Sequence, residues 1–314
     1  MAGSVDAESR YIEVSGLRLH YLLQAPAQQA DDADVPIIVF LHGFPEHCGV
    51  WRRQLAFFGQ RYQAIALDLP GYNLSEGPSN AHDYNVPNLV NLIARFIRSI
   101  ANNQPIYLVA HDWGGAIAWP LTARFPELIK RLVIINAAHP STFTREMIQN
   151  RQQRLMSDYI HTFLDPKAEE YLSQDGFKQL KQHSIEQIQS PPSEDEVAAY
   201  VAAWKRPGAV TRMLNYYRAM PQLFPREGIE SQQLDKNNTV RSLAEIRVPN
   251  IKIRVPTLIL WGEKDAAFDI GVLGGLGEYI DDYEELRFPA ASHWVHHEEP
   301  EAIQQAIDKF IYTA

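Results

Sequence analysis

Apolar and polar positions follow two rhythms along the chain, and these predict its strands and helices. A period of two on either side of Ser15-Gly16, at 11–14 and 17–23, predicts a β-hairpin. Continuous apolar runs typical of buried strands occupy 35–41, 106–110 and 132–135, and a further strand is predicted at 62–69. Helical periods fall between them, at 53–61, 85–100 and 116–125. This alternation predicts a mostly parallel, doubly wound α/β sheet.

The rhythm changes near residue 138. From 138 to 245 the chain is polar and helical in period, without a convincing strand. Strand patterns return at 257–262 and 285–288, and an amphipathic helix is predicted at 299–312. We therefore expect a core made of residues 1–137 and 246–314, with residues 138–245 inserted as an α-helical cap.

The strand at 106–110 leads into the segment with the clearest candidate chemistry, His111-Asp112-Trp113-Gly114-Gly115. Small residues on either side of Asp112 (Ala110 and Gly114) allow a very tight turn from strand to helix. Such a nucleophile elbow presents one side chain at the carboxyl end of a parallel sheet. The usual elbow carries Ser, whereas this one carries Asp112. The alternative is that Asp112 is an ordinary helix N-cap.

A second segment, His42-Gly43-Phe44-Pro45, follows the strand at 35–41. Gly43 lets the backbone approach another group closely, and the bond before Pro45 is a candidate for the cis form. The backbone N–H groups of Phe44 and Trp113 could together bind an oxyanion. An ordinary Gly-Pro loop is the alternative for this segment.

A carboxylate and a histidine follow the last two predicted strands. Asp265 lies just after 257–262, where it could orient a histidine, although a turn aspartate is the alternative. Asp269 is further from that strand, and the strand at 132–135 is followed only by Asn136. His293 comes after the last strand, so nucleophile, acid and histidine follow the order of the α/β-hydrolases.

The region after His293 raises the question of a metal site. His293, His296 and His297 are followed by Glu298, and such a group could bind a metal ion. On a loop that enters a helix, this spacing more often belongs to a solvated face. We therefore expect no metal and no cofactor.

Composition limits the class of protein. With 314 residues and 46% hydrophobic content, the chain can bury a large core. The net charge of −9 includes no basic run that would suggest nucleic acid or an anionic membrane. A single cysteine, Cys48, excludes an internal disulfide and favours a reducing compartment. With neither a membrane-spanning apolar run nor a signal-peptide core in the sequence, we expect a soluble, cytoplasmic protein.

These motifs together resemble the soluble epoxide hydrolases of the α/β-hydrolase fold superfamily. The resemblance covers nearly the whole chain from about Tyr11 and rests on five motifs: His42-Gly43-Phe44-Pro45-Glu46, Gly71-Tyr72-x-x-Ser75, His111-Asp112-Trp113-Gly114-Gly115, Glu263-Lys264-Asp265 and His293-Trp294. Two cap segments, Asp158-Tyr159-x-x-x-Phe163-x-Asp165-Pro166 and Asn215-Tyr216-Tyr217-Arg218, are similar to the lid-tyrosine motifs of this family. The match gives Tyr159 and Tyr217 the ring-opening role. Asn73-Leu74 departs from the smaller residues common in relatives.

The resemblance implies that Asp112 attacks an epoxide carbon and that His293, oriented by Asp265, activates water to hydrolyse the resulting ester. A serine would instead leave an ether, which water does not easily cleave. The expected partners are therefore a small hydrophobic epoxide and water, in a pocket bounded by Phe44 and Trp113. The sequence leaves open whether the protein is a monomer or a homodimer.

Two other functions compete with epoxide hydrolysis. A haloalkane or haloacid dehalogenase would use the same aspartate, but Phe44 stands where haloalkane dehalogenases often have Asn. Fluoroacetate dehalogenases carry Arg after the nucleophile and His in place of Tyr159, whereas this chain has Trp113 and a tyrosine. A non-catalytic binding protein of the same fold is the third possibility. The intact Asp112, Asp265 and His293 argue against it.

Overall fold

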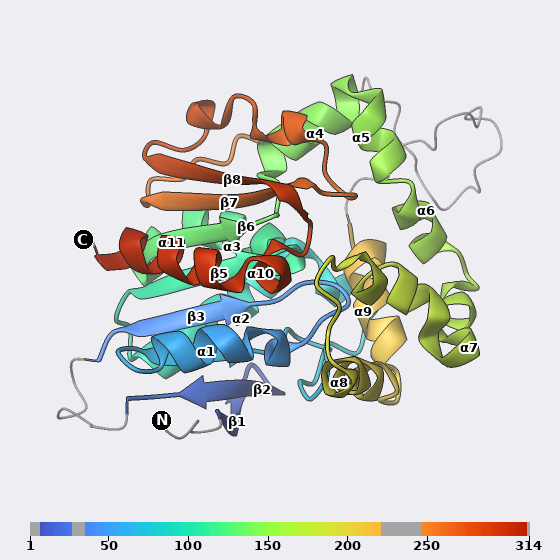
Figure 1. Cartoon of the computed structure of the whole chain (residues 1–314), viewed down its shortest axis with the longest axis horizontal. Helices are drawn as coiled ribbons and strands as arrows, with labels where there is room; N and C mark the ends of the chain where they lie inside the picture. Colours follow the sequence, from blue (N-terminus) through green and yellow to red (C-terminus); the bar gives the residue numbers. More distant parts are fainter. Residues whose placement is uncertain (1–6, 27–34, 221–245, 313–314) are drawn as a thin grey trace.

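The computed structural model describes residues 7–26, 35–220 and 246–312, and its described part is organised around an eight-stranded sheet (Figure 1). The strand order is β1-β2-β4-β3-β5-β6-β7-β8, with antiparallel pairing from β1 to β4 and parallel pairing beyond. The strands are β1 (Glu8–Val14), β2 (Leu17–Gln24), β3 (Ile37–Leu41), β4 (Gln63–Leu67), β5 (Ile106–His111), β6 (Ile129–Ile135), β7 (Thr257–Lys264) and β8 (Tyr283–Ser292). The predicted hairpin and mostly parallel sheet are thus confirmed.

Helices cover both faces of this sheet and enclose two apolar cores. Figure 1 shows α1 (Arg52–Phe58) and α11 (Pro300–Tyr312) in front, with α2 (Val86–Ala101) and α3 (Trp113–Arg124) behind. Strand side chains alternate between the two cores. In β3, for example, Val39 and Leu41 pack on the α2 side, and Ile38 and Phe40 on the α1 side. Such alternation explains why the buried strands read as continuous apolar runs.

The helix α2 shows how the sequence pattern produces the packing. Its N-terminus is capped by the Asn85 side chain, which accepts from the Asn88 backbone N–H at 3.0 Å, and Pro87 occupies the first turn. Leu89, Ile93 and Phe96 recur at helical spacing and are fully buried. Each such side chain contributes roughly 1.5–3 kcal/mol through burial.

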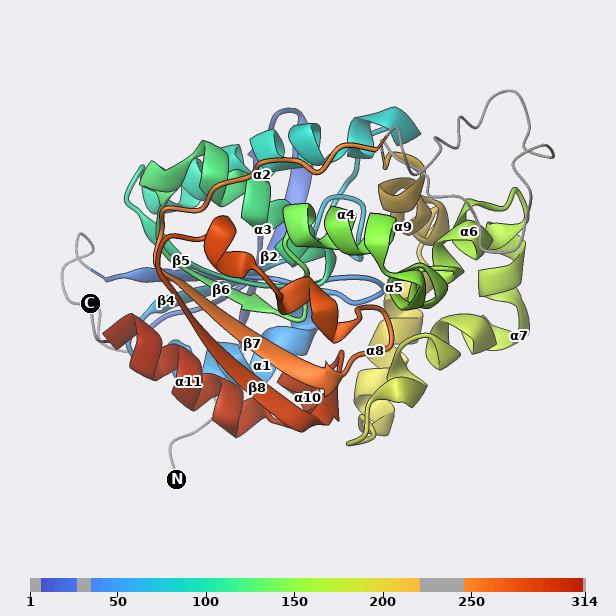
Figure 2. The same cartoon turned by 90° about the horizontal axis from the view of Figure 1, so that it is seen from above.

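The elements that the structure describes between β6 and β7 are helices. The α-helices are α4 (Pro140–Gln149), α5 (Arg151–Met156), α6 (Tyr159–Leu164), α7 (Ala168–Gln182, interrupted by non-helical residues 174–177), α8 (Glu194–Trp204) and α9 (Ala209–Arg218). Both views place α6, α7, α8 and α9 beyond one end of the sheet (Figure 2). The 221–245 part of the predicted cap lies outside the described residues.

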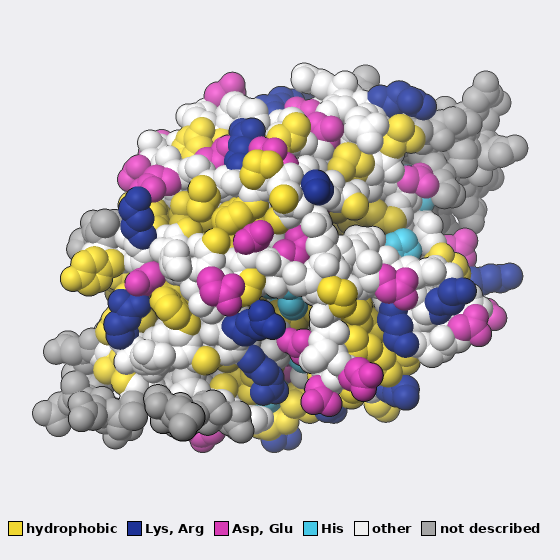
Figure 3. Space-filling view, viewed as in Figure 1, with side chains coloured by type: hydrophobic (Ala, Val, Ile, Leu, Met, Phe, Trp, Pro, Cys, Tyr) yellow, Lys and Arg dark blue, Asp and Glu magenta, His cyan; other side chains and the backbone are white. Residues whose placement is uncertain are grey.

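Short elements complete the description: α10 (Val295–Glu298) and the 3₁₀ helices η1 (Cys48–Trp51), η2 (Ala81–Tyr84), η3 (Pro126–Leu128), η4 (Ile185–Gln187), η7 (Ile270–Leu273) and η8 (Leu276–Glu278). Among the helices of the described ranges, none combines the length and apolar character needed to cross a membrane. On the face in Figure 3, basic and acidic side chains are interspersed.

Candidate active site

Asp112 occupies the tight turn between β5 and α3. Its backbone has φ of 48° and ψ of −118°, which is a strained conformation for a residue with a side chain. The turn brings the start of α3 so close to β3 that a Cβ on Gly114 would lie 2.6 Å from the Leu41 carbonyl oxygen. Glycine is therefore required there. The predicted elbow geometry is present, and the Asp112 side chain makes no capping hydrogen bond to α3.

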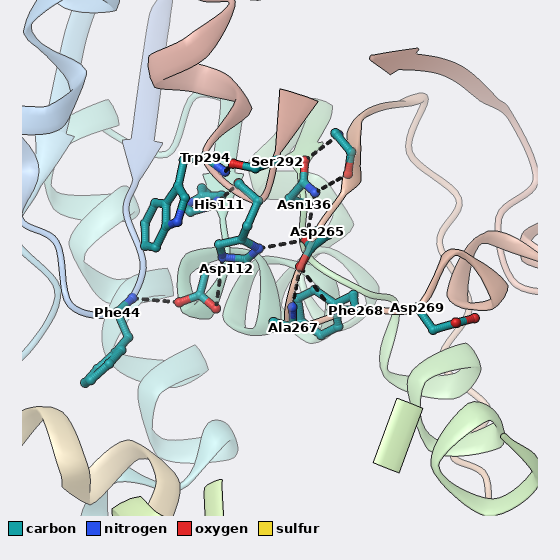
Figure 4. Close-up of polar contacts among 12 residues, drawn as sticks. Phe44, His111, Asp112, Asn136, Asp265, Ala267, Phe268, Asp269, Ser292 and Trp294 are labelled. Carbon is teal, nitrogen blue, oxygen red and sulfur yellow. Dashed lines mark hydrogen bonds and ion pairs between the residues drawn. The ribbon is translucent and has the colours of Figure 1, made fainter. Parts of the chain in front are cut away.

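The loop after β3 holds one oxygen of Asp112. The backbone N–H of Phe44 donates to Asp112 Oδ1 at 2.6 Å (Figure 4). A Cβ on Gly43 would lie 2.2 Å from the same oxygen, so this approach also requires glycine. The Phe44-Pro45 peptide bond is cis, as anticipated. Trp113 begins α3, and its ring packs 5.2 Å from the ring of Tyr217.

His293 faces Asp112 from the other side and is oriented by Asp265. Its Nδ1 donates to Asp265 Oδ2 at 2.7 Å, and its Nε2 lies 3.9 Å from Asp112 Oδ2. Asp265 Oδ1 accepts from two backbone N–H groups, those of Ala267 at 2.7 Å and Phe268 at 3.0 Å. The three residues predicted from chain order therefore lie in one line, in which a hydrogen bond joins Asp265 to His293 and His293 approaches Asp112 to 3.9 Å.

Asp269, the other candidate for the acid, lies outside the hydrogen bonds of the site, whereas Asn136 takes part in them. Asp269 lies apart from Asp112 and Asp265 (Figure 4), and it accepts from the Gly271 backbone N–H at 2.9 Å and from Asn150 at 3.0 Å. Asn136, passed over in the sequence because it has no carboxylate, donates to Asp265 Oδ2 at 2.7 Å. It also has a positive φ of 38° after β6. The sequence indicates neither this hydrogen bond nor the positive φ, apart from the position of Asn136 at the end of a strand.

Charges within the site change its protonation. Burial alone would lower the pKa of His293, but the charges of Asp265 and Asp112 raise it to about 9. Burial would raise the pKa of Asp265, but the charge and hydrogen bond of His293, together with the Asn136 donor, hold it below its usual value. His293 is therefore a proton carrier whose state depends on the neighbouring carboxylates.

Tyr159 and Tyr217 come from α6 and α9 and meet above Asp112. Their ring centroids are 6.2 Å apart, and both tyrosines line the cavity that contains Asp112 and His293. The pKa of each phenol is raised, first by burial and also by the negative charge of Asp112. Both groups therefore keep their protons at neutral pH and are available as donors.

The cavity that contains Asp112 and His293 has a volume of about 300 Å³. Most of its other walls are apolar or aromatic, and they are formed by Phe44, Leu155, Met156, Phe163, Ala266, Ala267 and Trp294, with His183 and Gln187 as polar neighbours. The phenol rings pack closely with these walls, since the Tyr217 centroid lies 5.3 Å from that of Phe44 and 5.1 Å from that of Phe163. A small apolar molecule with one polar atom suits this chemistry.

A sequence profile of the alpha/beta hydrolase fold matches residues 36–300. The chain is also 30% identical to "Epoxide hydrolase 3" of Xenopus tropicalis, over 99% of this chain and 80% of that protein. The chain belongs to the epoxide hydrolases of the α/β-hydrolase fold family. It is 31% identical to "Epoxide hydrolase 1" of Caenorhabditis elegans, over 97% of this chain and 70% of that protein.

Solved structures agree with this family assignment. An epoxide hydrolase from Bacillus megaterium superimposes with a TM-score of 0.82 at 31% identity, covering 96% of this chain and all of that one. An epoxide hydrolase from metagenomes of hot environments superimposes with a TM-score of 0.81 at 29% identity, covering 97% of this chain and 98% of that chain. The inserted helices are thus part of a shared fold.

Proposed function

We propose that this protein hydrolyses small hydrophobic epoxides to vicinal diols, with water as the second substrate. The observation that carries the proposal is an aspartate at the elbow that shares an apolar cavity of about 300 Å³ with two phenols, the half-buried Tyr159 and the buried Tyr217. A carboxylate forms an ester with an sp³ carbon, and an ester can be hydrolysed. The phenols match what an opening epoxide needs, since its oxygen gains negative charge and must receive a proton.

The first step is attack by Asp112 on an epoxide carbon. Because Oδ1 already accepts from the Phe44 N–H, Oδ2 is the oxygen that attacks. The carbon–oxygen bond of the ring breaks as the new ester bond forms, and the ring oxygen takes its proton from Tyr159 or Tyr217. The product of this step is an alkyl ester on Asp112 with a neighbouring hydroxyl group.

The second step hydrolyses that ester. His293, held by Asp265, takes a proton from water as the water oxygen attacks the carboxyl carbon of Asp112. Oδ1 becomes the oxyanion beside the Phe44 N–H, and the Trp113 N–H is the proposed second donor. Collapse of this intermediate expels the diol with Oδ2, which takes the proton held by His293, and the proton left on the Asp112 carboxyl group returns to the tyrosinate. One Asp112 oxygen therefore leaves in the product and a water oxygen replaces it.

We also infer the domain roles. Residues 1–137 and 246–314 act as the core that carries Asp112, Asp265 and His293, and residues 138–245 act as a cap that supplies both phenols. The reaction routes no step through a metal or cofactor, because the chain itself supplies the nucleophile, the base and the proton donors. Release of halide is not favoured, because a leaving halide needs no proton.

Diol formation from a panel of terminal, styrene-type and fatty-acid epoxides tests the proposal, with a primary alkyl halide beside them. The expected result is diol from at least one epoxide, followed by mass spectrometry, and loss of that activity in Asp112→Asn. Turnover of the halide alone would make the protein a dehalogenase. Binding of epoxides without turnover of any substrate would make it a binding protein.

A further inference from the structure

A second cluster of titratable side chains lies behind His293, away from the proposed chemistry. Its members are Glu46 from the loop after β3, His111 at the end of β5, and His296 and His297 of α10. Glu46, His111 and His296 are 1%, 0% and 2% exposed, which contradicts the expectation that the histidines after His293 form a solvated face. Polar groups buried to this extent are costly unless they are fully paired.

The two oxygens of Glu46 have different surroundings. Oε1 accepts from Tyr200 of α8 at 2.8 Å and lies 2.7 Å from His297 Nε2. Oε2 lies 3.3 Å from His111 Nδ1 and 3.4 Å from His296 Nε2, yet it makes no hydrogen bond with any described residue. Both ring nitrogens of His296 and the Nδ1 of His111 are likewise without a hydrogen-bond partner among the described side chains and backbone. Two ring nitrogens without a hydrogen bond thus face Oε2 at ion-pair distance.

The His111 ring is fixed on its other side by the backbone of His293. His111 Nε2 lies 3.1 Å from the backbone carbonyl oxygen of His293, and because a carbonyl only accepts, Nε2 carries a proton. The other ring nitrogen of His111, Nδ1, faces Glu46 Oε2 at 3.3 Å and makes no hydrogen bond to it.

We propose that Glu46, His296 and His297 bind a divalent transition-metal ion, with Zn²⁺ as the representative. Their ligand atoms lie within 4.8 Å of one another. Two ligands bound to Zn²⁺ at about 2.1 Å in a tetrahedron are roughly 3.4 Å apart. The separation of Glu46 Oε2 and His296 Nε2 is 3.4 Å. Two imidazoles and a carboxylate suit such an ion and leave a fourth position open.

A route for the ion exists that does not pass through the active-site cavity. His296 and His297 line a separate cavity of about 620 Å³, which Tyr200 and His47 also border. The His297 side chain is 16% exposed, so this ligand is the one nearest to solvent. The ion would enter from this rear cavity and reach Glu46 without passing Tyr159 or Tyr217, which line the other cavity.

A similar cluster on the other side of β3 shows what a fully paired arrangement looks like. Asp68 accepts from the His20 ring at 2.6 Å, the Cys48 backbone N–H at 2.7 Å and Asn73 at 2.9 Å. This carboxylate therefore has its partners within the protein and needs no ion. Only the Glu46 cluster combines metal-ligand side chains with unpaired atoms in the described chain.

Cobalt provides the test, because Co²⁺ replaces Zn²⁺ in such sites and absorbs visible light when its coordination is tetrahedral or five-coordinate. Full-length protein is treated with a chelator, dialysed and titrated with Co²⁺. We expect a visible band that saturates at a single equivalent and disappears when Zn²⁺ is added. The thermal midpoint should rise with Zn²⁺ concentration, because an ion that binds the folded state stabilises it.

His297→Gln is the decisive variant, and His82→Gln, which changes an exposed histidine of η2, is its control. We expect His82→Gln to bind as the parent does and His297→Gln to lose more than about 100-fold in affinity, since loss of a residue that only orients a metal ligand already costs about 10–100-fold. If His297→Gln does not fold, His297→Cys decides, because a thiolate ligand adds a sulfur-to-cobalt charge-transfer band.

Three results would overturn the metal site: no saturable Co²⁺ band in the parent, undiminished binding by folded His297→Gln, or no charge-transfer band in His297→Cys. Epoxide turnover is not used as a readout. The metal site and the proposed function therefore stand or fall separately.

Discussion

The charge of Asp112 should control when His293 holds its proton. The two side chains approach to 3.9 Å, from Nε2 to Oδ2. At an effective dielectric constant of about 20, unit charges at that separation attract by about 4 kcal/mol. This energy corresponds to roughly a thousand-fold in a proton-binding equilibrium. Burial and Asp265 also act on His293, but they act whether or not Asp112 is charged.

Asp112→Asn removes the negative charge of the side chain, as ester formation does. The amide also keeps the shape of the carboxylate. We expect the pKa of His293 to fall from about 9 in the parent to near or below neutrality. Nitrogen-15 NMR of labelled histidine rings measures this directly. The matched control is Asp269→Asn, which neutralises a carboxylate that contacts Asn150 and Gly271 instead. In that control the pKa of His293 should remain about 9.

A lower pKa of His293 after ester formation has a kinetic consequence. Below pH 9 the resting His293 carries a proton, and it cannot act as a base in that state. Once Asp112 is an ester, the imidazole is neutral over a wider pH range, so single-turnover hydrolysis of the ester should reach its plateau well below pH 9. A His293 pKa that stays near 9 in Asp112→Asn, with intact mass showing that the amide has survived, would refute this reasoning.

Other groups in the site can be tested in the same way. His293→Gln should open epoxides but hydrolyse the ester very slowly, so intact-protein mass spectrometry should find one substrate mass on the Asp112 peptide; no adduct there contradicts the covalent route. Tyr159→Phe and Tyr217→Phe should each slow ester formation about 10²–10³-fold in stopped-flow measurements, and the double variant more; an unimpaired double variant excludes the phenols as donors. Asn136→Ala removes a 2.7 Å donor to the carboxylate that orients His293. Its kcat should fall about 10-fold or more at unchanged KM, since a hydrogen bond to a charged group contributes about 1.5–3 kcal/mol, and an unchanged kcat would make Asn136 dispensable.

The core of the sheet could be read from the sequence because its strands are buried on both faces. β3, for example, is apolar at every position and fully buried, so period and composition agree. β8 shows where this signal ends. It runs Tyr283–Ser292, whereas the apolar pattern indicated only 285–288. As an edge strand, most of its residues are exposed, and exposed positions carry no hydrophobic constraint.

The site was predictable to the extent that chain order and local turns determine it. Asp112 and His293 lie in turns that directly follow strands, and the sequence offers few other candidate residues at such positions. Asn136 could not be predicted as a partner of Asp265, because their contact depends on β6 pairing with β7 across more than a hundred residues. Glu46 was part of a recognised motif, but its pairing with α10 needed the tertiary structure.

The charge of Asp112 therefore influences the protonation of the other catalytic groups in the site. Burial raises the pKa of each of the two phenols and lowers that of His293, which Asp265 raises again, and the negative charge of Asp112 raises the pKa of all three groups. While Asp112 is charged, each of these groups retains its proton. Ester formation removes that charge at the moment when a phenol must give up its proton and just before His293 must accept one from water. A serine at the elbow carries no charge to lose and could not link the two steps in this way.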